Sequence, residues 1–268
     1  MPEALKAGFP TYWTSFGQGP RAALMIHCSL AHSGSWGGMA RHLSGALTMT
    51  AFDLPGHGRS ADWDERAEIQ GLCVDIAAEF LREPTDIIGH SFGATVALRL
   101  AVARPDLVRS LTLIEPVCFV VAFHDQPSLR ARLDARMADF DTAILAGDHA
   151  SAAQSFLAVW GDRAGWEHLP ETVRDALAAQ MPVVAAGQSA LHTDLAGMLR
   201  PGVLEALDIP VLVCEGSESP FIMSAITEGL AARLPRAERT ILAGAGHMAP
   251  ISHAHQTSAE LLQFLRGC

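Results

Sequence analysis

The sequence predicts an α/β protein with a doubly wound, mostly parallel sheet and an inserted all-helical cap. Two observations support this fold class. Short apolar runs alternate with segments of helical period in both the first and the last part of the chain. Between them, residues 117–207 are Ala-rich and helical in period, without a convincing strand. We therefore expect a core domain formed by residues 1–116 and 208–268, with residues 117–207 inserted as the cap.

Composition sets limits on the class of protein. A chain of 268 residues that is 49% hydrophobic can fill the core of one large α/β domain. No apolar stretch approaches the roughly 18 residues of a membrane span. The first residues lack an apolar segment after a basic start, so we expect no secretory signal and a cytoplasmic location. The net charge is −10 without a basic stripe, which argues against nucleic-acid binding.

Cysteine usage predicts reduced thiols in the core of a cytosolic protein. The number of cysteines is odd, and no C-x-x-C or Cys/His metal-ligand spacing occurs. This spacing predicts no metal site. We also expect no organic cofactor. The five cysteines are Cys28, Cys73, Cys118, Cys214 and Cys268.

The first elements predict an edge hairpin followed by the start of the parallel sheet. Residues 1–20 carry polar residues and Gly/Pro punctuation typical of a hairpin. Residues 22–26 are continuously apolar, as in a strand buried on both faces of a sheet. Residues 39–44 predict a short helix, and residues 47–52 predict the next strand.

The same alternation continues on both sides of the cap. Apolar residues recur at i, i+3, i+4 and i+7 over 69–80, which predicts a helix that ends before Pro84. A short apolar strand and a helix follow, and residues 107–114 predict another strand that leads into Glu115. After the cap, strands are predicted over 211–214 and 239–242, with helices over 221–234 and 252–265.

Residues 89–93 read GHSFG, a G-x-S-x-G motif between a predicted strand and a predicted helix. A serine at such a sharp turn sits in strained and crowded backbone, where Gly89 and Gly93 leave out clashing Cβ atoms. The turn directs the Ser91 hydroxyl outward, and the amide of Phe92 opens a helix toward bound negative charge. Ser91 is therefore a candidate nucleophile, whereas a serine in an ordinary Gly-flanked turn is the alternative.

Three further motifs accompany GHSFG in order: HCS at 27–29, DLPGHGRS at 53–60 and GAGHMAP at 244–250. With these motifs the chain resembles an α/β-hydrolase with a helical cap, over nearly its whole length. The resemblance implies a nucleophile, an acid and a histidine in that chain order. Ser91 matches the nucleophile. His247 matches the base that takes the serine proton.

The acid departs from the common pattern of the family. Family members usually carry an aspartate three residues beyond a glycine in the loop after the strand at 211–214, and Ser219 stands at that position. Glu115 is the favoured substitute, because certain haloalkane dehalogenases carry their acid on the corresponding strand and the chain order is preserved. Glu218, one residue out of register, is the alternative acid.

The resemblance also implies an oxyanion hole and a pocket. The two donors are the amides of Phe92 and Ser29, with Cys28 standing where glycine is usual. His27 is expected to brace this loop. Trp36 is expected either at the pocket floor or packed in the core. The candidate pocket residues are Leu30, Trp36, Phe119 and Met248.

These residues predict a serine hydrolase that cleaves an ester or related acyl bond of a small to medium, partly apolar substrate through an acyl-enzyme. A serine nucleophile disfavours dehalogenase and epoxide hydrolase activity, for which family members use aspartate. Carbon–carbon bond, thioester or lactone hydrolysis and cofactor-free peroxidase-type activity stay open. The rival from another class is a non-catalytic small-molecule receptor, motivated by Ser219 at the usual acid position. Loss of turnover on substitution of Glu115 would favour the serine hydrolase over the receptor.

Overall fold

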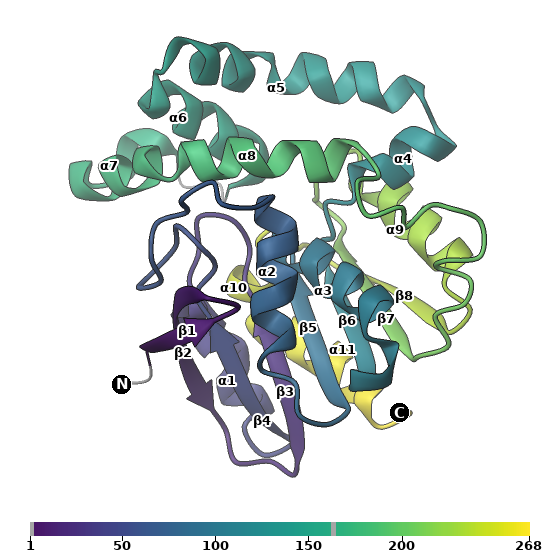
Figure 1. Ribbon diagram of the computed structural model, residues 1–268. Helices are drawn as coiled ribbons and strands as arrows, with labels where there is room; N and C mark the ends of the chain where they lie inside the picture. The colour runs from purple at the N-terminus through teal and green to yellow at the C-terminus, as the bar shows by residue number, and fades with distance from the viewer. Residues whose placement is uncertain (1–2, 162–164) are drawn as a thin grey trace.

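The computed structural model describes residues 3–161 and 165–268; residues 1–2 of the predicted hairpin and 162–164 of the predicted cap lie outside the described residues. The described residues form an eight-stranded sheet with the order β1-β2-β4-β3-β5-β6-β7-β8 (Figure 1). The strands are β1 (Glu3–Lys6), β2 (Phe9–Phe16), β3 (Arg21–Ile26), β4 (Leu47–Phe52), β5 (Thr85–His90), β6 (Val108–Ile114), β7 (Val211–Gly216) and β8 (Ala237–Leu242).

The sheet is mostly parallel, as predicted. β1 pairs with β2, and β2 with β4, in antiparallel fashion, whereas every pairing from β4 to β8 is parallel. β3 lies between β4 and β5, so the strand order reverses there. In open α/β sheets, ligands bind at such a reversal, beyond the carboxyl ends of the strands.

Helices cover both faces, which confirms the doubly wound class. One apolar cluster contains residues of α2 and α3, and another contains residues of α1 and α11. Apolar runs of the strands supply both clusters, because residues such as Leu24 and Met25 point to opposite faces. The core helices are α1 (Gly37–Leu43), α2 (Ile69–Ala78), α3 (Phe92–Ala103), α9 (Met223–Arg233), α10 (Ala249–Ser252) and α11 (Ala254–Leu265).

Helices from the inserted segment form a layer over one end of the sheet (Figure 1). They are α4 (Phe119–Asp125), α5 (Ser128–Ala146), α6 (His149–Trp160), α7 (Glu171–Ala179) and α8 (Met181–His192). Residues 193–207 are turns rather than the predicted helix, because Asp194 instead accepts hydrogen bonds from the amides of Met198 and Leu199. The boundaries at 117 and 207 stay a prediction.

All five cysteines are free thiols, and four of them are buried. Cys268 is exposed, so the expectation of core thiols is wrong for this residue, which follows the last helical turn. Within residues 3–161 and 165–268, no helix has the length and apolarity needed to cross a membrane.

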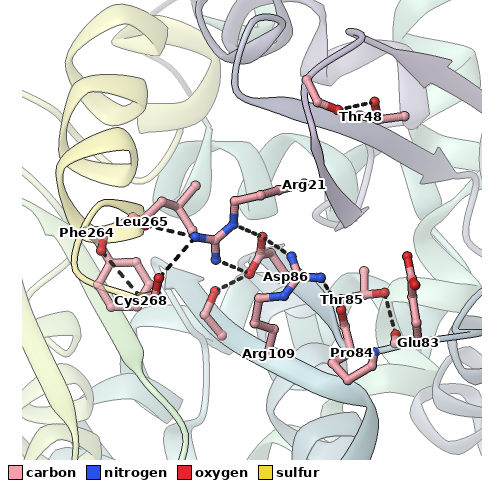
Figure 2. Close-up of polar contacts among 12 residues, drawn as sticks. Arg21, Thr48, Glu83, Pro84, Thr85, Asp86, Arg109, Phe264, Leu265 and Cys268 are labelled. Atoms are coloured by element: carbon pink, nitrogen blue, oxygen red, sulfur yellow. Dashed lines mark hydrogen bonds and ion pairs between the residues drawn. The ribbon is translucent and has the colours of Figure 1, made fainter.

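A buried carboxylate lies near the start of β5, at the end of the sheet away from the helical layer (Figure 1), and Figure 2 shows its contacts. Asp86, near the start of β5, is 1% exposed. Its oxygens accept hydrogen bonds from Nε and Nη2 of Arg21 at 2.9 and 2.8 Å, from Nη1 of Arg109 at 3.2 Å and from Oγ of Ser110 at 2.8 Å. Arg21 also donates to the carbonyl of Leu265, which ties the C-terminal helix to this point.

Candidate active site

Ser91 lies in the sharp turn between β5 and α3, with φ 54° and ψ −119°. This strained backbone is possible because the flanking glycines let chain segments approach closely. A Cβ on Gly89 would lie 2.4 Å from the carbonyl oxygen of Gly93, and one on Gly93 would lie 2.2 Å from that of Ile26. These close approaches hold Ser91 at the carboxyl end of β5, and a side chain at either glycine would break them.

The side chains of Ser91, His247 and Glu115 are hydrogen-bonded in series. Nε2 of His247 lies 2.9 Å from Oγ of Ser91, and Nδ1 lies 3.0 Å from Oε2 of Glu115. All three residues are buried. An ionised carboxylate only accepts hydrogen bonds, so Nδ1 carries the proton and Nε2 is the acceptor that faces the serine hydroxyl.

The second carboxylate oxygen of Glu115 is held by the neighbouring strand. Oε1 accepts hydrogen bonds from Oγ of Ser219 at 2.6 Å and from the amide of Gly216 at 2.5 Å. Burial raises the pKa of Glu115, but the hydrogen bonds and charge of His247 and the donors Ser219 and Gly216 outweigh it, so the net pKa is lowered. Ser219, at the usual acid position, therefore supports the carboxylate that stands on β6's end.

Glu218 lies in the loop after β7, next to Ser219. Its amide donates to the carbonyl of Ala245 at 2.8 Å, and the residue lines an open groove that also reaches His247. The carboxylate bonded to Nδ1 of His247 is that of Glu115. The geometry thus favours Glu115 over Glu218 as the candidate acid.

Two backbone amides stand beside Ser91 as candidate oxyanion donors. Phe92 is the first residue of α3, so its amide has no acceptor one turn earlier in the helix. The amide of Ser29 takes part in no hydrogen bond among the described residues. The following residue, Leu30, has φ 64°, which gives this loop its sharp bend. Ser29 and Phe92 both line a cavity with Ser91.

Histidines brace the surrounding loops. Nδ1 of His27 donates to the carbonyl of Cys28 at 2.7 Å, and Nε2 accepts from the amide of Leu54 at 3.0 Å, so His27 joins the ends of β3 and β4. Nε2 of His90 donates to the carbonyl of His247 at 2.8 Å. Burial, with a smaller contribution from His247, lowers the pKa of His90 to about 3, so this ring stays neutral.

Ser91 lies at the junction of two cavities, which we name the inner and the outer cavity. The inner cavity is lined by Ser29, Leu54, Pro55, His57, Ile69, Cys73, Ser91, Phe92, Val117, Phe119, Phe156, Trp160, Val183, Val184, Gly187, Gln188 and Leu191. The outer cavity is lined by Cys28, Ser29, Leu30, Ser91, Phe156, Leu157, Trp160, Gly161, Leu177, His247, Met248 and Ile251.

Three of the four candidate pocket residues line these cavities: Phe119 the inner one, Leu30 and Met248 the outer one. Trp36 lies elsewhere. It is 2% exposed in the apolar cluster of α1 and α11, because the turn over 33–36 leads the chain away toward that face.

Sequence reasoning missed lining residues from both the core, such as His57, and the cap. Trp160 contacts His247 edge-on with ring centroids 5.0 Å apart, and it lines both cavities. Val183 and Gln188 of α8 line the inner cavity. Their only sequence signal is a helical cap segment, which does not say which helical face meets the serine.

Within the described part of the chain, no three or more His, Cys, Asp or Glu side chains group as metal ligands would.

The sheet and the hydrogen-bonded serine, histidine and glutamate define a class of protein, the hydrolases built on a doubly wound sheet. The model of the Alpha/beta hydrolase family matches residues 23–260, and the chain belongs to this family.

Among its relatives is the pimeloyl-[acyl-carrier protein] methyl ester esterase of Methylococcus capsulatus, 30% identical over 259 residues that cover 93% of this chain and 96% of the relative. Lipase LipV of Mycobacterium tuberculosis is 36% identical over 126 residues, 46% of each chain. An epoxide hydrolase from Bacillus megaterium shares the fold with a TM-score of 0.76 at 18% identity, covering 99% of this chain and 100% of that one.

Proposed function

We propose that this chain hydrolyses carboxylic esters through an acyl-enzyme, with Ser91 as nucleophile, His247 as base and Glu115 as acid. The observation that carries the proposal is the series of two hydrogen bonds, 2.9 and 3.0 Å long, that joins the three side chains. A serine hydroxyl is a weak nucleophile until a base takes its proton, and this series supplies a base with its acceptor nitrogen toward the serine.

Each group has a defined role in the proposed reaction. Ser91 attacks the ester carbonyl while His247 takes the hydroxyl proton, and the carboxylate of Glu115 stabilises the imidazolium that forms. The amides of Phe92 and Ser29 bind the developing oxyanion, and losing one such donor typically costs about 100- to 1,000-fold in rate. His247 then protonates the leaving alcohol, and a water activated by the same ring hydrolyses the acyl-enzyme.

We infer from the position of His247 which half of the ester each cavity holds. The leaving oxygen receives its proton from His247, so the alcohol must lie on the side of this ring. His247 lines the outer cavity and is absent from the inner lining. The alcohol therefore occupies the outer cavity and the acyl chain the inner one, among apolar residues such as Phe119 and Leu191. The methyl ester named for the Methylococcus relative supports a small alcohol.

Labelling with a fluorophosphonate, followed by intact-mass spectrometry, tests the nucleophile. We expect one adduct on the wild type, none on Ser91→Ala, and one on Ser189→Ala, a matched control for an exposed serine of α8. Hydrolysis of methyl hexanoate should fall by about 10⁵- to 10⁶-fold in Ser91→Ala. If folded wild-type protein resists both this probe and a small sulfonyl fluoride, the receptor alternative gains and the proposal fails.

A further inference from the structure

Among the polar side chains that line the inner cavity, those of His57 and Gln188 have no role in the proposed reaction. His57 belongs to the turn after β4 and is 5% exposed. Its Nε2 atom is buried and, among the described residues, has no hydrogen-bond partner. Buried polar atoms are nearly always satisfied, so this atom points to a missing partner.

The bonding of the other ring nitrogen fixes what that partner must be. Nδ1 of His57 lies 2.9 Å from the carbonyl oxygen of Pro55, and a carbonyl only accepts, so Nδ1 carries the hydrogen. Burial lowers the pKa of His57 and keeps the ring neutral. Nε2 is then a bare acceptor, and it requires a ligand group that donates a hydrogen bond.

Gln188 supplies the complementary chemistry from the cap side of the same cavity. It lies on α8 of the cap, is half-buried and makes no side-chain hydrogen bond within the described part of the chain. Its amide both donates and accepts. Of the common uncharged groups, a hydroxyl can donate to His57 and accept from Gln188 at once. Most of the other lining residues are apolar, which suits the alkyl part of an acyl chain.

We propose that the inner cavity holds a subsite for a hydroxyl group on the acyl chain, formed by Nε2 of His57 and the amide of Gln188. The preferred esters are then those of hydroxylated aliphatic acids rather than plain alkyl acids. The proposal rests on the ester hydrolysis proposed above and adds its substrate class.

The test compares kcat/KM for methyl hexanoate, methyl 3-hydroxyhexanoate and methyl 6-hydroxyhexanoate, followed by acid release. We expect one hydroxylated ester to be favoured over methyl hexanoate by about tenfold, the usual effect of one satisfied neutral hydrogen bond. His57→Asn keeps a donor for the Pro55 carbonyl but removes the acceptor, and Gln188→Leu removes the amide. Both should reduce the ratio to about one, whereas Ser189→Ala should retain it.

A binding measurement separates this proposal from the reaction itself. The Ser91→Ala variant is titrated with hexan-1-ol and hexane-1,6-diol by ligand-observed NMR. Tighter binding of the diol, lost in the double variant with His57→Asn, supports the subsite. Equal binding, or a wild-type ratio of one or less for both hydroxylated esters, overturns it. If methyl hexanoate is not hydrolysed at all, the proposed function fails, while the titration still decides the subsite.

Discussion

Two buried carboxylates stand at opposite ends of the paired strands β5 and β6, in different chemical surroundings. Asp86, near the start of β5, lies between Arg21 and Arg109 (Figure 2) and also accepts a hydrogen bond from the hydroxyl of Ser110. Glu115, directly after β6, is surrounded by His247, a hydroxyl and an amide. The two carboxylates are 1% and 0% exposed, so burial does not distinguish them.

The hydrogen-bonding partners distinguish the two carboxylates. Arginine keeps its charge at every relevant pH, so the charge of Asp86 is compensated permanently and the group serves as an anchor. Glu115 has neutral donors and one titratable ring, so its charge is compensated only when His247 gains a proton. A buried carboxylate whose cation appears only during a reaction suits general base catalysis. The type of partner, and not the depth of burial, therefore distinguishes Asp86, a structural anchor, from Glu115, the proposed catalytic acid.

The largest expected effect is on turnover, at Glu115, the proposed catalytic acid. Glu115→Gln keeps the shape of the side chain but removes the charge that stabilises the imidazolium, so kcat for ester hydrolysis should fall by about 10⁴-fold. Circular dichroism should show an unchanged fold. Glu218→Gln is the matched control, and its kcat should stay within a few-fold of the wild type. A large loss of kcat in this variant would indicate that Glu218, and not Glu115, is the acid.

The second effect is on stability, at the anchoring carboxylate. Asp86→Asn leaves two guanidinium groups without their counter-charge, and we expect the free energy of unfolding to fall by about 3 kcal/mol. The value lies at the low end of the usual range because Arg21 and Arg109 are partly exposed. Urea unfolding measures this change in the free energy of unfolding. The kcat of folded Asp86→Asn should match that of the wild type. Asp106→Asn, which breaks an exposed pair with Arg104, should not shift the midpoint.

The smallest effect concerns Ser219, which donates a hydrogen bond to the carboxylate of Glu115. Ser219→Ala removes a hydrogen bond to a charged group, worth about 2 kcal/mol in the free energy of unfolding. The pKa of Glu115 is lowered in the folded state, so this stabilisation is present above the unfolded pKa and is lost as the pH falls through the folded pKa. The difference between wild type and variant should therefore be full at pH 7 and shrink below about pH 4.

Ser217→Ala provides the control for this pH dependence. Ser217 lies in the same loop and accepts a neutral hydrogen bond from the amide of Gly244. Its loss should cost less and should not vary with pH in this range. A Ser219→Ala effect that is equally independent of pH would mean that Ser219 only packs the loop and does not stabilise the carboxylate.

Much of the fold could be predicted because its signals are local. The strand predicted over 47–52 has the observed bounds of β4, since an apolar run ends at turn residues. β7 continues to Gly216, two residues past its predicted end, because pairing with β8 extends to Leu242. The predicted closing helix over 252–265 is divided at His253, where φ is −125°. The exact ends of such strands and helices depend on tertiary pairing and packing rather than on local sequence pattern.

The site likewise contains residues that local motifs predict and residues that only tertiary packing places there. Ser91 and His247 stand in short motifs whose glycines are required locally, and the strand order places Glu115 beside the loop of Ser219. The lining of the cavities has no such local signal. Trp160 and Gln188 reach the site only through the packing of cap helices on the core, and Trp36 leaves it because a turn redirects the chain.

Leu30, Ser91 and Glu115 are three of the five non-glycine residues with positive φ in the described chain, and all three adjoin the site. Each such conformation costs on the order of 1–3 kcal/mol, against a total stability of roughly 5–15 kcal/mol for a typical domain. Glycine at these positions would relieve the strain. A laboratory evolution experiment that rewarded heat resistance alone would therefore select against the site, and only a simultaneous demand for turnover would preserve it.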